Sequence, residues 1–420
     1  MTSIVKKHFA AGAINKPRGW SIAGIMVFIA STNGRRAALA RRISRRQSRI
    51  WKPLVRLRLP RSLSTVCISL LVLVYVAGQG AAIAAQPFAE LNERAIDEYV
   101  LPGFKKLESA TSKLAASLGE VCGRPAGQLI AVRDHFKQTV LAWAGVDFLR
   151  LGPLGEDARA ERFNFSPDPR RTVERQLRKL LVRRDAEVLD PELLAKKSVA
   201  VQGLPALEVL LTSKKNSILS DTEDGRYRCR LAHSIAINLE TIAREAVSGW
   251  SGTNGWREKM LDPDADDAQY KSSTEAAAAL VRALVTGLQL IQDRQIMPMI
   301  VAQSKPGRTL RLPFLHAGLS ADYIARSIKS CKRFYLAMNL SDYIPATEDW
   351  MNPWIMGAFN RIAREGPAAV RSFSDGQKDL ERERNLRFLR FQVEGIRKLI
   401  ERKIAPVAAL TIGFNELDGD

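Results

Sequence analysis

Apolar residues recur every three or four positions along most of the chain beyond residue 100. This spacing is typical of helices that bury one face, whereas the alternating pattern of half-buried strands is scarce. The sequence therefore predicts an all-α protein. Long helices are predicted near residues 104–121, 231–250, 280–291, 324–338 and 386–400.

Polar, Gly- and Pro-containing segments separate these stretches. Asp190-Pro191-Glu192 has the residues of a helix start: an N-cap acceptor, a Pro at the first helical position and an acid in the first turn. Long loops, where binding sites of helical proteins often lie, are predicted at residues 152–171, 217–225, 249–267, 304–317 and 342–375.

The segment at residues 249–267 is the best boundary between two halves, which we place at residues 85–250 and 251–420. Each half contains several long apolar periodicities. This inventory suits two helix bundles.

Positive charge is concentrated at the N-terminal end. The chain has 420 residues and a net charge of +20, and 15 Lys and Arg precede the first acid, Glu90. Residues 85–420 carry a net charge of only +5. The charge of this larger part gives no reason to expect nucleic acid as a partner.

Residues 1–84 resemble a leader with a Sec-type signal peptide. Arg56, Arg58 and Arg61 precede an apolar h-region at residues 66–77, and small residues follow, with cleavage expected near Ala84. We predict export to the periplasm. An uncleaved membrane anchor is the alternative, although the apolar run is shorter than the roughly 20 residues that cross a bilayer.

More than fifty residues precede this signal, which is unusual. Either translation begins near Val55 or Leu57, or the extension is genuine; Ser44-Arg45-Arg46 only loosely matches a twin-arginine signal. Cys67 has no preceding lipidation box, so a lipid anchor is not expected.

Three cysteines remain after the expected cleavage: Cys122, Cys229 and Cys331. An oxidising compartment would permit one disulfide among three pairings, and we favour Cys122 with Cys229. The alternative is that all three are buried thiols, which suits Cys331 on its apolar helical stripe. No Cys-x-x-Cys spacing supports a zinc ribbon or a thioredoxin-like site.

Three segments together resemble the imelysin-like family of exported bacterial proteins. They lie at residues 136–153, at residues 201–211 with 228–232, and at residues 413–420. The resemblance implies two four-helix bundles that face each other around a cleft. It also implies a periplasmic or outer-membrane location and a link to iron uptake.

The family's marker is Gly-x-His-x-x-Glu, because a His and a Glu three apart on a helix can reach one cation. Gly203 and Glu208 match this marker, but Pro205 replaces the His. Proline suits a first helical turn and cannot ligate a metal. Glu208 either interacts with the helix dipole or a buried Arg, or offers its oxygens to a ligand.

Asp147 and Arg150 match an acidic and a basic position of the family. The resemblance places Asp147 in the cleft with Glu208 as an oxygen ligand for a hard cation. Arg150 would either bind an anion or neutralise these acids. His316, in a predicted loop, is the histidine best placed to replace the missing ligand, and His135 and His233 are expected to be ordinary helix-face residues.

Other candidate features have ordinary explanations. Trp350 and Trp354 are candidates to rim the cleft, whereas Trp143 is expected in the core. The basic run at residues 382–390 is interleaved with acids and is read as a solvated helix face. Neither a His-Glu-x-x-His motif nor a Gly-x-Ser-x-Gly elbow is present.

These residues favour a non-catalytic binding or uptake accessory protein. We expect iron or another divalent metal, or a small ligand, in a cleft formed by Gly203, Pro205, Glu208, Asp147 and Arg150, and a periplasmic or outer-membrane protein as a possible partner. An imelysin-type metallopeptidase and a partner-docking structural module are the alternatives.

Overall fold

The computed structural model describes residues 87–122, 129–213, 217–263, 269–304, 310–371 and 380–413. All of them belong to one unit of the chain, Ile83–Asp420. Within these ranges the regular elements are helices and no strand occurs, so the all-α prediction is confirmed. The predicted leader and residues 414–420 lie outside the described residues.

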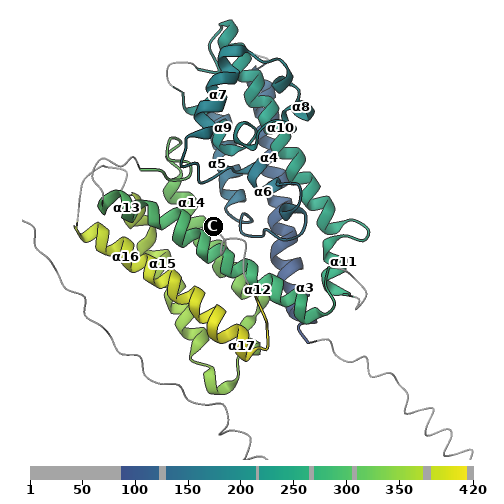
Figure 1. Cartoon of the computed structure of the whole chain (residues 1–420), viewed down its shortest axis with the longest axis vertical. Helices are drawn as coiled ribbons and strands as arrows, with labels where there is room; N and C mark the ends of the chain where they lie inside the picture. The colour runs from purple at the N-terminus through teal and green to yellow at the C-terminus, as the bar shows by residue number, and fades with distance from the viewer. Residues whose placement is uncertain are drawn as a thin grey trace, which may run out of the picture. The chain divides into compact units, whose positions relative to one another are not determined.

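The first group of helices forms around two long neighbours, α4 (Leu101–Cys122) and α10 (Glu223–Ser251), with α5 (Leu129–Trp143) packed on α4 (Figure 1). The apolar stripe predicted for α4 is buried, including Phe104 and Leu114. The shorter helices α7 (Thr172–Arg183) and α9 (Leu204–Thr212) pack on each other and on α10.

The second group contains four longer helical stretches. They are α12 (Ser273–Leu290), which continues through the π-helical turn η6 (Ile291–Ile296) into α13 (Met297–Ser304); α14 (Ser320–Met338); α15 (Met351–Arg371); and α16 (Leu380–Leu399), which continues through η10 (Ile400–Ile404) into α17 (Ala405–Val407). Figure 1 shows α16 alongside α12. Helix α15 packs on both of its neighbours in the sequence, α14 and α16.

The continuous helix Ser273–Ala302 is apolar and long enough to cross a membrane. However, 72% of its most apolar window is buried within the protein. Its burial against α14 and α16 explains its composition as that of a core helix.

The first described helices connect the two groups. α3 (Ala89–Arg94) and η2 (Ala95–Val100) run directly into α4, yet they pack against α12 and α14. Asp97 in η2 also makes two hydrogen bonds of 2.7 Å with Arg257 of α11 (Trp256–Leu261). Residues 89–100 precede the predicted boundary at residue 250, yet they pack with helices that follow it.

One predicted loop is wrong. Residues 342–375 contain the 21-residue helix α15, which the Pro and Gly residues seemed to exclude. Pro353 lies in its first turn, where a helix needs no N–H donor, and Pro367 lies near its end. Met351, Ile355 and Ile362 supply the buried face.

Shorter elements occupy the connections. Asp190 caps α8 as predicted, accepting hydrogen bonds from the backbone of Glu192 at 2.8 Å and Leu193 at 3.3 Å. The short helices are η3 (Gly152–Gly155), α6 (Arg159–Phe163), η4 (Glu187–Leu189), α8 (Pro191–Leu194), η5 (Val199–Val201), η7 (Leu340–Tyr343) and η8 (Ala346–Glu348).

A disulfide joins the end of α4 to the first turns of α10. It pairs Cys122 with Cys229, the pairing that the sequence favoured, with 5.5 Å between their Cα atoms. Cys331 is a buried free thiol on α14. Gly287 of α12 lies where a Cβ would be 2.9 Å from the Cys331 sulfur, so the close crossing of these helices requires a glycine.

Candidate functional site

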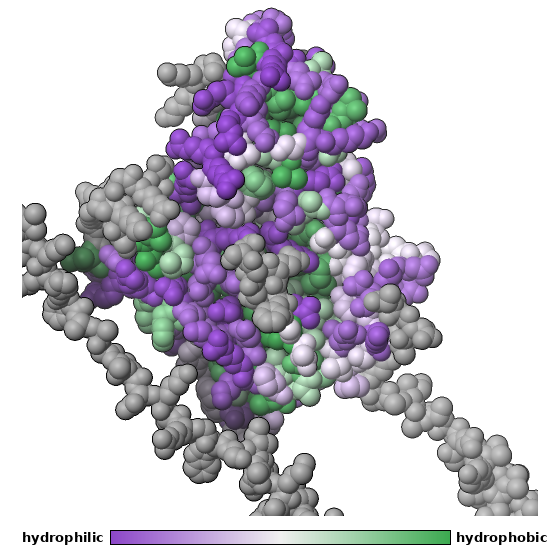
Figure 2. Space-filling view, viewed as in Figure 1, coloured by the Kyte–Doolittle hydropathy of each residue, from purple (hydrophilic) through white to green (hydrophobic). Residues whose placement is uncertain are grey.

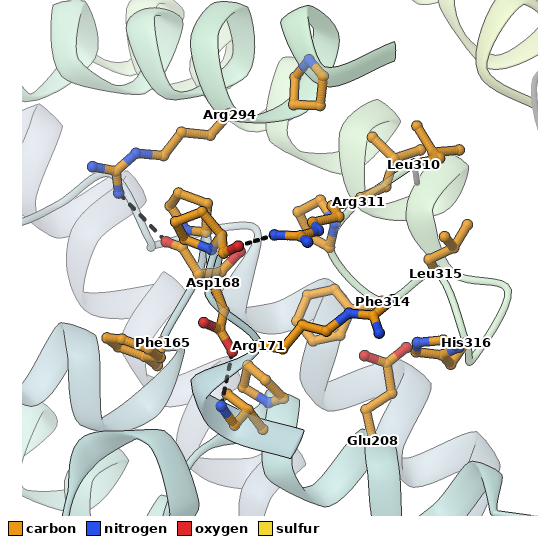
Figure 3. Close-up of a pocket in the computed structure, with 18 of the residues that line it drawn as sticks. Phe165, Asp168, Arg171, Glu208, Arg294, Leu310, Arg311, Phe314, Leu315 and His316 are labelled. Atoms are coloured by element: carbon orange, nitrogen blue, oxygen red, sulfur yellow. Dashed lines mark hydrogen bonds between the residues drawn. The ribbon is translucent and has the colours of Figure 1, made fainter. Parts of the chain in front are cut away.

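A cavity of about 660 Å³ lies among segments from both helix groups. One side is formed by residues 164–174 and the first turns of α9, and the other by η6, α13 and residues 310–316 (Figure 3). Two of the loops predicted from the sequence as binding segments therefore meet at this cavity.

Most of the wall is apolar, and charged side chains lie among the apolar ones. The apolar residues are Phe165, Pro167, Pro169, Val173, Pro205, Val209, Met297, Pro298, Val301, Ala302, Leu310, Leu312, Pro313, Phe314 and Leu315. The charged residues are Asp168, Arg171, Glu174, Glu208, Asp293, Arg294 and Arg311, with His316 beside them. An apolar wall with a few polar groups is typical of a small-ligand site.

Among the predicted charged site residues, Glu208 is the one that lines the cavity together with its predicted neighbour His316. It projects from α9 and is 6% exposed, and its carboxylate accepts a 2.9 Å hydrogen bond from the backbone N–H of Ala317. The backbone N–H of His316 also donates to it. Figure 3 shows the carboxylate beside His316. Glu208 therefore holds the loop at residues 310–319 against α9.

Burial raises the pKa of Glu208, because the charged form loses water. The Ala317 hydrogen bond, the charge of His316 and the His316 backbone hydrogen bond act in the opposite direction. Neither explanation offered from the sequence, the helix dipole or an Arg partner, describes this environment. Backbone donors of a distant loop engage the carboxylate instead.

Gly203 and Pro205 set the start of α9. Gly203 is the N-cap, and a Cβ there would lie 2.7 Å from the carbonyl oxygens of Arg162 and Phe163. The glycine of the family marker thus permits close backbone packing. Pro205 is in the first turn, as predicted, and forms part of the cavity wall.

Asp147 is not brought to Glu208. It follows α5, is 7% exposed, and accepts a 2.5 Å hydrogen bond from the Tyr323 hydroxyl. Burial raises its pKa to about 6, against the opposing effects of Tyr323 and Arg150. Phe314, which does line the cavity, packs on the Tyr323 ring, so Asp147 lies one layer behind the wall.

Arg150 has a counter-ion that the sequence did not indicate, Glu161, and its charge also lowers the pKa of Asp147. Its guanidinium pairs with Glu161 at 2.7 Å and donates to the backbone carbonyl of Asp147 at 3.2 Å. It borders a separate surface hollow near Trp256 and Tyr270. Arg150 therefore orders the segment after α5, away from the cavity wall.

The remaining histidines and tryptophans lie elsewhere. His233 is on α10 against Gly119, and burial lowers its pKa; His135 is on α5. Trp143 is buried and stacks on Phe163, as expected for a core residue. Neither Trp350 nor Trp354 lines the cavity.

Sequence reasoning missed three other charged residues of the cavity wall, Arg294, Arg311 and Asp168. Arg311 donates to the carbonyl of Pro169, and Arg294 donates to that of Ser166 at 3.4 Å. Asp168 accepts from the backbone N–H groups of Thr172 and Val173, both at 2.8 Å. The signal was the Pro-rich run before α7, since such a loop has carbonyls free for side-chain donors.

The side chains around Glu208 do not fit a resident metal ion. Zinc sites use three or four protein ligands, and within the described ranges no three His, Cys, Asp or Glu residues group closely enough to hold a metal. Glu208 and His316 are adjacent, but Asp147 does not line the cavity. A metal in this cavity would need donors from a ligand that accompanies it.

Comparison with known proteins gives the family. The sequence profile described as imelysin, Peptidase M75, matches residues 100–386. No curated protein matches the chain significantly.

Two solved structures resemble the fold. An imelysin-like protein from Psychrobacter arcticum 273-4 has a TM-score of 0.61 and 18% identity, covering 78% of this chain and 97% of that one. A structure assigned as an iron-regulated protein A precursor from Parabacteroides distasonis ATCC 8503 has a TM-score of 0.56 and 12% identity, covering 76% and 96%. At these identities the likeness concerns the fold, whereas the profile match over most of the chain shows that the protein belongs to the imelysin family.

Proposed function

We propose that this imelysin-family protein is an exported, non-catalytic binding protein whose cavity holds a small ligand with iron or another divalent metal as cargo. One observation carries the proposal. The family marker lies at a cavity of about 660 Å³, but its His position is Pro205 and its Glu208 carboxylate is engaged by two backbone N–H groups.

The same observation disfavours an imelysin-type metallopeptidase. Metal-assisted hydrolysis needs protein ligands that fix the ion and leave one position open. Pro205 contributes no nitrogen, and Glu208 is committed to the loop that carries His316. The peptidase alternative would require a donor set different from the one assembled here.

The cavity supports a ligand with an apolar body and anionic groups. Asp168 and Glu208 already accept two backbone N–H groups each. Arg311 and Arg171 face the same space from opposite segments, and guanidinium groups bind carboxylates through paired hydrogen bonds. A metal chelate with carboxylate groups supplies the anionic part of this chemistry.

Export is supported by the leader sequence and by the disulfide. Disulfides persist in oxidising compartments such as the periplasm, and Cys122–Cys229 closes a separation of 107 residues. A periplasmic or outer-membrane partner would then receive the bound cargo. The partner-docking alternative would leave the cavity incidental.

Equilibrium dialysis of the full chain with ferric citrate, citrate alone and ferrous iron alone tests the ligand. We expect saturable binding of ferric citrate, weakened about tenfold or more by Arg311→Ala, since a charge-assisted hydrogen bond contributes roughly 1.5–3 kcal/mol. Arg364→Ala removes an exposed Arg outside the cavity and is the matched control.

Two outcomes would contradict the proposal. Equal binding by wild type and Arg311→Ala, with both folded by circular dichroism, would place the ligand outside this cavity. Chelator-sensitive cleavage of unfolded casein that disappears in Glu208→Gln would instead establish the peptidase.

A further inference from the structure

A short stretch around α7 accounts for the net positive charge beyond the leader. Residues 170–184 include seven Lys and Arg and a single acid, Glu174, for a net charge of +6. Residues 85–420 as a whole carry +5, so the remainder of that region is close to neutral. The seven cations are Arg170, Arg171, Arg175, Arg178, Lys179, Arg183 and Arg184.

The helix separates these cations from its apolar face. Val173 and Leu177 are buried, and α7 packs through this side on α9 and α10. The positions on the opposite side, 175, 178, 179 and 182, follow a spacing of three and four and are all exposed. Figure 2 shows a largely hydrophilic surface over α7.

Val182 is an apolar residue in the middle of this charged side, and it is 80% exposed. Arg178 precedes it by four residues and Lys179 by three, so both flank it on the helix surface. A shallow groove beside it is lined by apolar residues, by four arginines and by two acids. They are Leu177, Leu181, Val182 and Val209; Arg178, Arg183, Arg184 and Arg228; and Glu174 and Asp224.

The cations of this outer face lack acidic partners among the described residues. No carboxylate of those ranges lies within ion-pair distance of Arg175, Arg178, Lys179 or Arg183. Like charges three or four apart destabilise a helix by a few tenths of a kcal/mol per pair. A function that uses the charge would explain why the arrangement is tolerated.

Helix α16 provides an internal comparison. It is also rich in Arg on its exposed face, but its cations alternate with acids and form ion pairs at a spacing of four, such as Arg387 with Glu383 and Lys398 with Glu394. This is the arrangement of a solvated face. On α7 only the cations at the two ends pair with acids of the described part of the chain, Arg171 with Glu174 and Arg184 with Glu223, and those of the outer face do not.

We propose that the outer face of α7 binds an anionic phospholipid surface, with Val182 inserted among the headgroups. The apolar face of α7 is buried in the protein, so the attraction comes from its outward cations, each of which strengthens binding to an anionic surface roughly fivefold. An exposed apolar residue surrounded by cations fits a lipid headgroup region better than an acidic protein, which would require no central apolar contact.

Hydrogen–deuterium exchange of the full chain with vesicles of phosphatidylglycerol tests this proposal locally. We expect residues 172–184 to be protected on these vesicles and not on phosphatidylcholine, with protection lost as salt rises. In Arg175→Gln/Arg178→Gln/Lys179→Gln, half-maximal protection should require about a hundredfold more lipid. The leader is identical in every variant, so differences within this segment report on α7.

Control variants distinguish lipid from other partners. Arg384→Gln/Arg387→Gln/Arg390→Gln removes the same charge from α16 and should leave protection of α7 unchanged. Val182→Ser should weaken protection and Val182→Phe should strengthen it.

Three outcomes would overturn the proposal. They are absence of protection on anionic vesicles, equal loss of protection in the α16 variant, and full protection by soluble polyglutamate with no effect of Val182→Ser. The last outcome would identify an acidic protein as the partner.

Discussion

A buried carboxylate paired with a tyrosine hydroxyl connects the two helix groups at the residue scale. Tyr323 of α14 donates to Asp147, and both side chains are buried. Burial raises the pKa of Asp147 to about 6 and that of Tyr323 well above its ordinary value. Each partner compensates for part of the cost of removing the other from water.

The raised pKa of Asp147 predicts a pH-dependent stability. Its folded pKa of about 6 exceeds the unfolded value near 3.9, so the folded state binds more protons between these values. The contribution of Asp147 to the unfolding free energy is fully present below about pH 4 and is lost as pH rises through about 6. It amounts to roughly 2 to 3 kcal/mol.

Urea unfolding of wild type and Asp147→Asn between pH 4 and 7 measures this contribution. The difference in unfolding free energy between the two proteins should change across that interval, becoming less favourable to wild type at higher pH. A difference that is independent of pH would show that Asp147 does not titrate there.

Gly203 illustrates a requirement that comes from packing. Gly203→Ala would place a Cβ 2.7 Å from two backbone carbonyl oxygens, which cannot move as a side chain can. We expect a loss of about 1 to 3 kcal/mol in unfolding free energy. In Gly357→Ala, within α15, the added Cβ would lie 3.7 Å from the end of the flexible Arg361 side chain. We expect this variant to leave the unfolding free energy unchanged or to raise it by up to about 1 kcal/mol.

Thermal denaturation followed by circular dichroism would compare these two glycine variants. If both lowered the melting temperature equally, the close approach at Gly203 would not be the cause.

The position of Glu208 at a cavity could be expected from the sequence, but its partner could not. Spacing along α9 indicates which residues share a face, whereas the Ala317 backbone that binds Glu208 lies 109 residues away. Asp147 shows the same limit in reverse. It was expected beside Glu208, but it accepts a hydrogen bond from Tyr323 and does not line the cavity.

At the scale of elements, hydrophobic periodicity located the long helices well. It failed for α15 because Pro and Gly were read as interruptions, although Pro353 occupies a turn that needs no N–H donor. The buried spacing Met351, Ile355, Ile362 was present in the sequence. In this segment the apolar spacing is a better indicator of the helix than the Pro and Gly residues are of a loop.

The disulfide between α4 and α10 predicts a loss of stability when it is removed. It restricts an unfolded-state loop of 107 residues, for which chain-entropy arguments give up to about 4–5 kcal/mol. We expect Cys122→Ala/Cys229→Ala to lower the unfolding free energy by about 2–4 kcal/mol in urea. Cys331→Ala, which changes a free buried thiol, is the single-site comparison.

If the double cysteine variant were as stable as wild type, the disulfide would not stabilise the protein by restricting its unfolded chain.

At the scale of the whole molecule, the sequence suggested two halves divided near residue 250, and helix packing links them. Tyr99 of η2 donates to the carbonyl of Gly145 at 2.8 Å, while its ring lies 5.0 Å from that of Phe334 on α14. One side chain thus contacts both helix groups. Sequence periodicity cannot reveal this link, because it describes one helix at a time.

This link predicts that the two helix groups unfold together. Tyr99→Ala should lower the unfolding free energy by about 3 kcal/mol and should accelerate hydrogen exchange equally in α10 and α16, since large aromatic truncations in a core cost roughly 3–5 kcal/mol. Tyr99→Phe keeps the ring and loses only the hydrogen bond, so it should cost about 1 kcal/mol. Faster exchange in α16 with unchanged exchange in α10 would mean that each group unfolds separately, because a shared transition must expose the slowest amides of both.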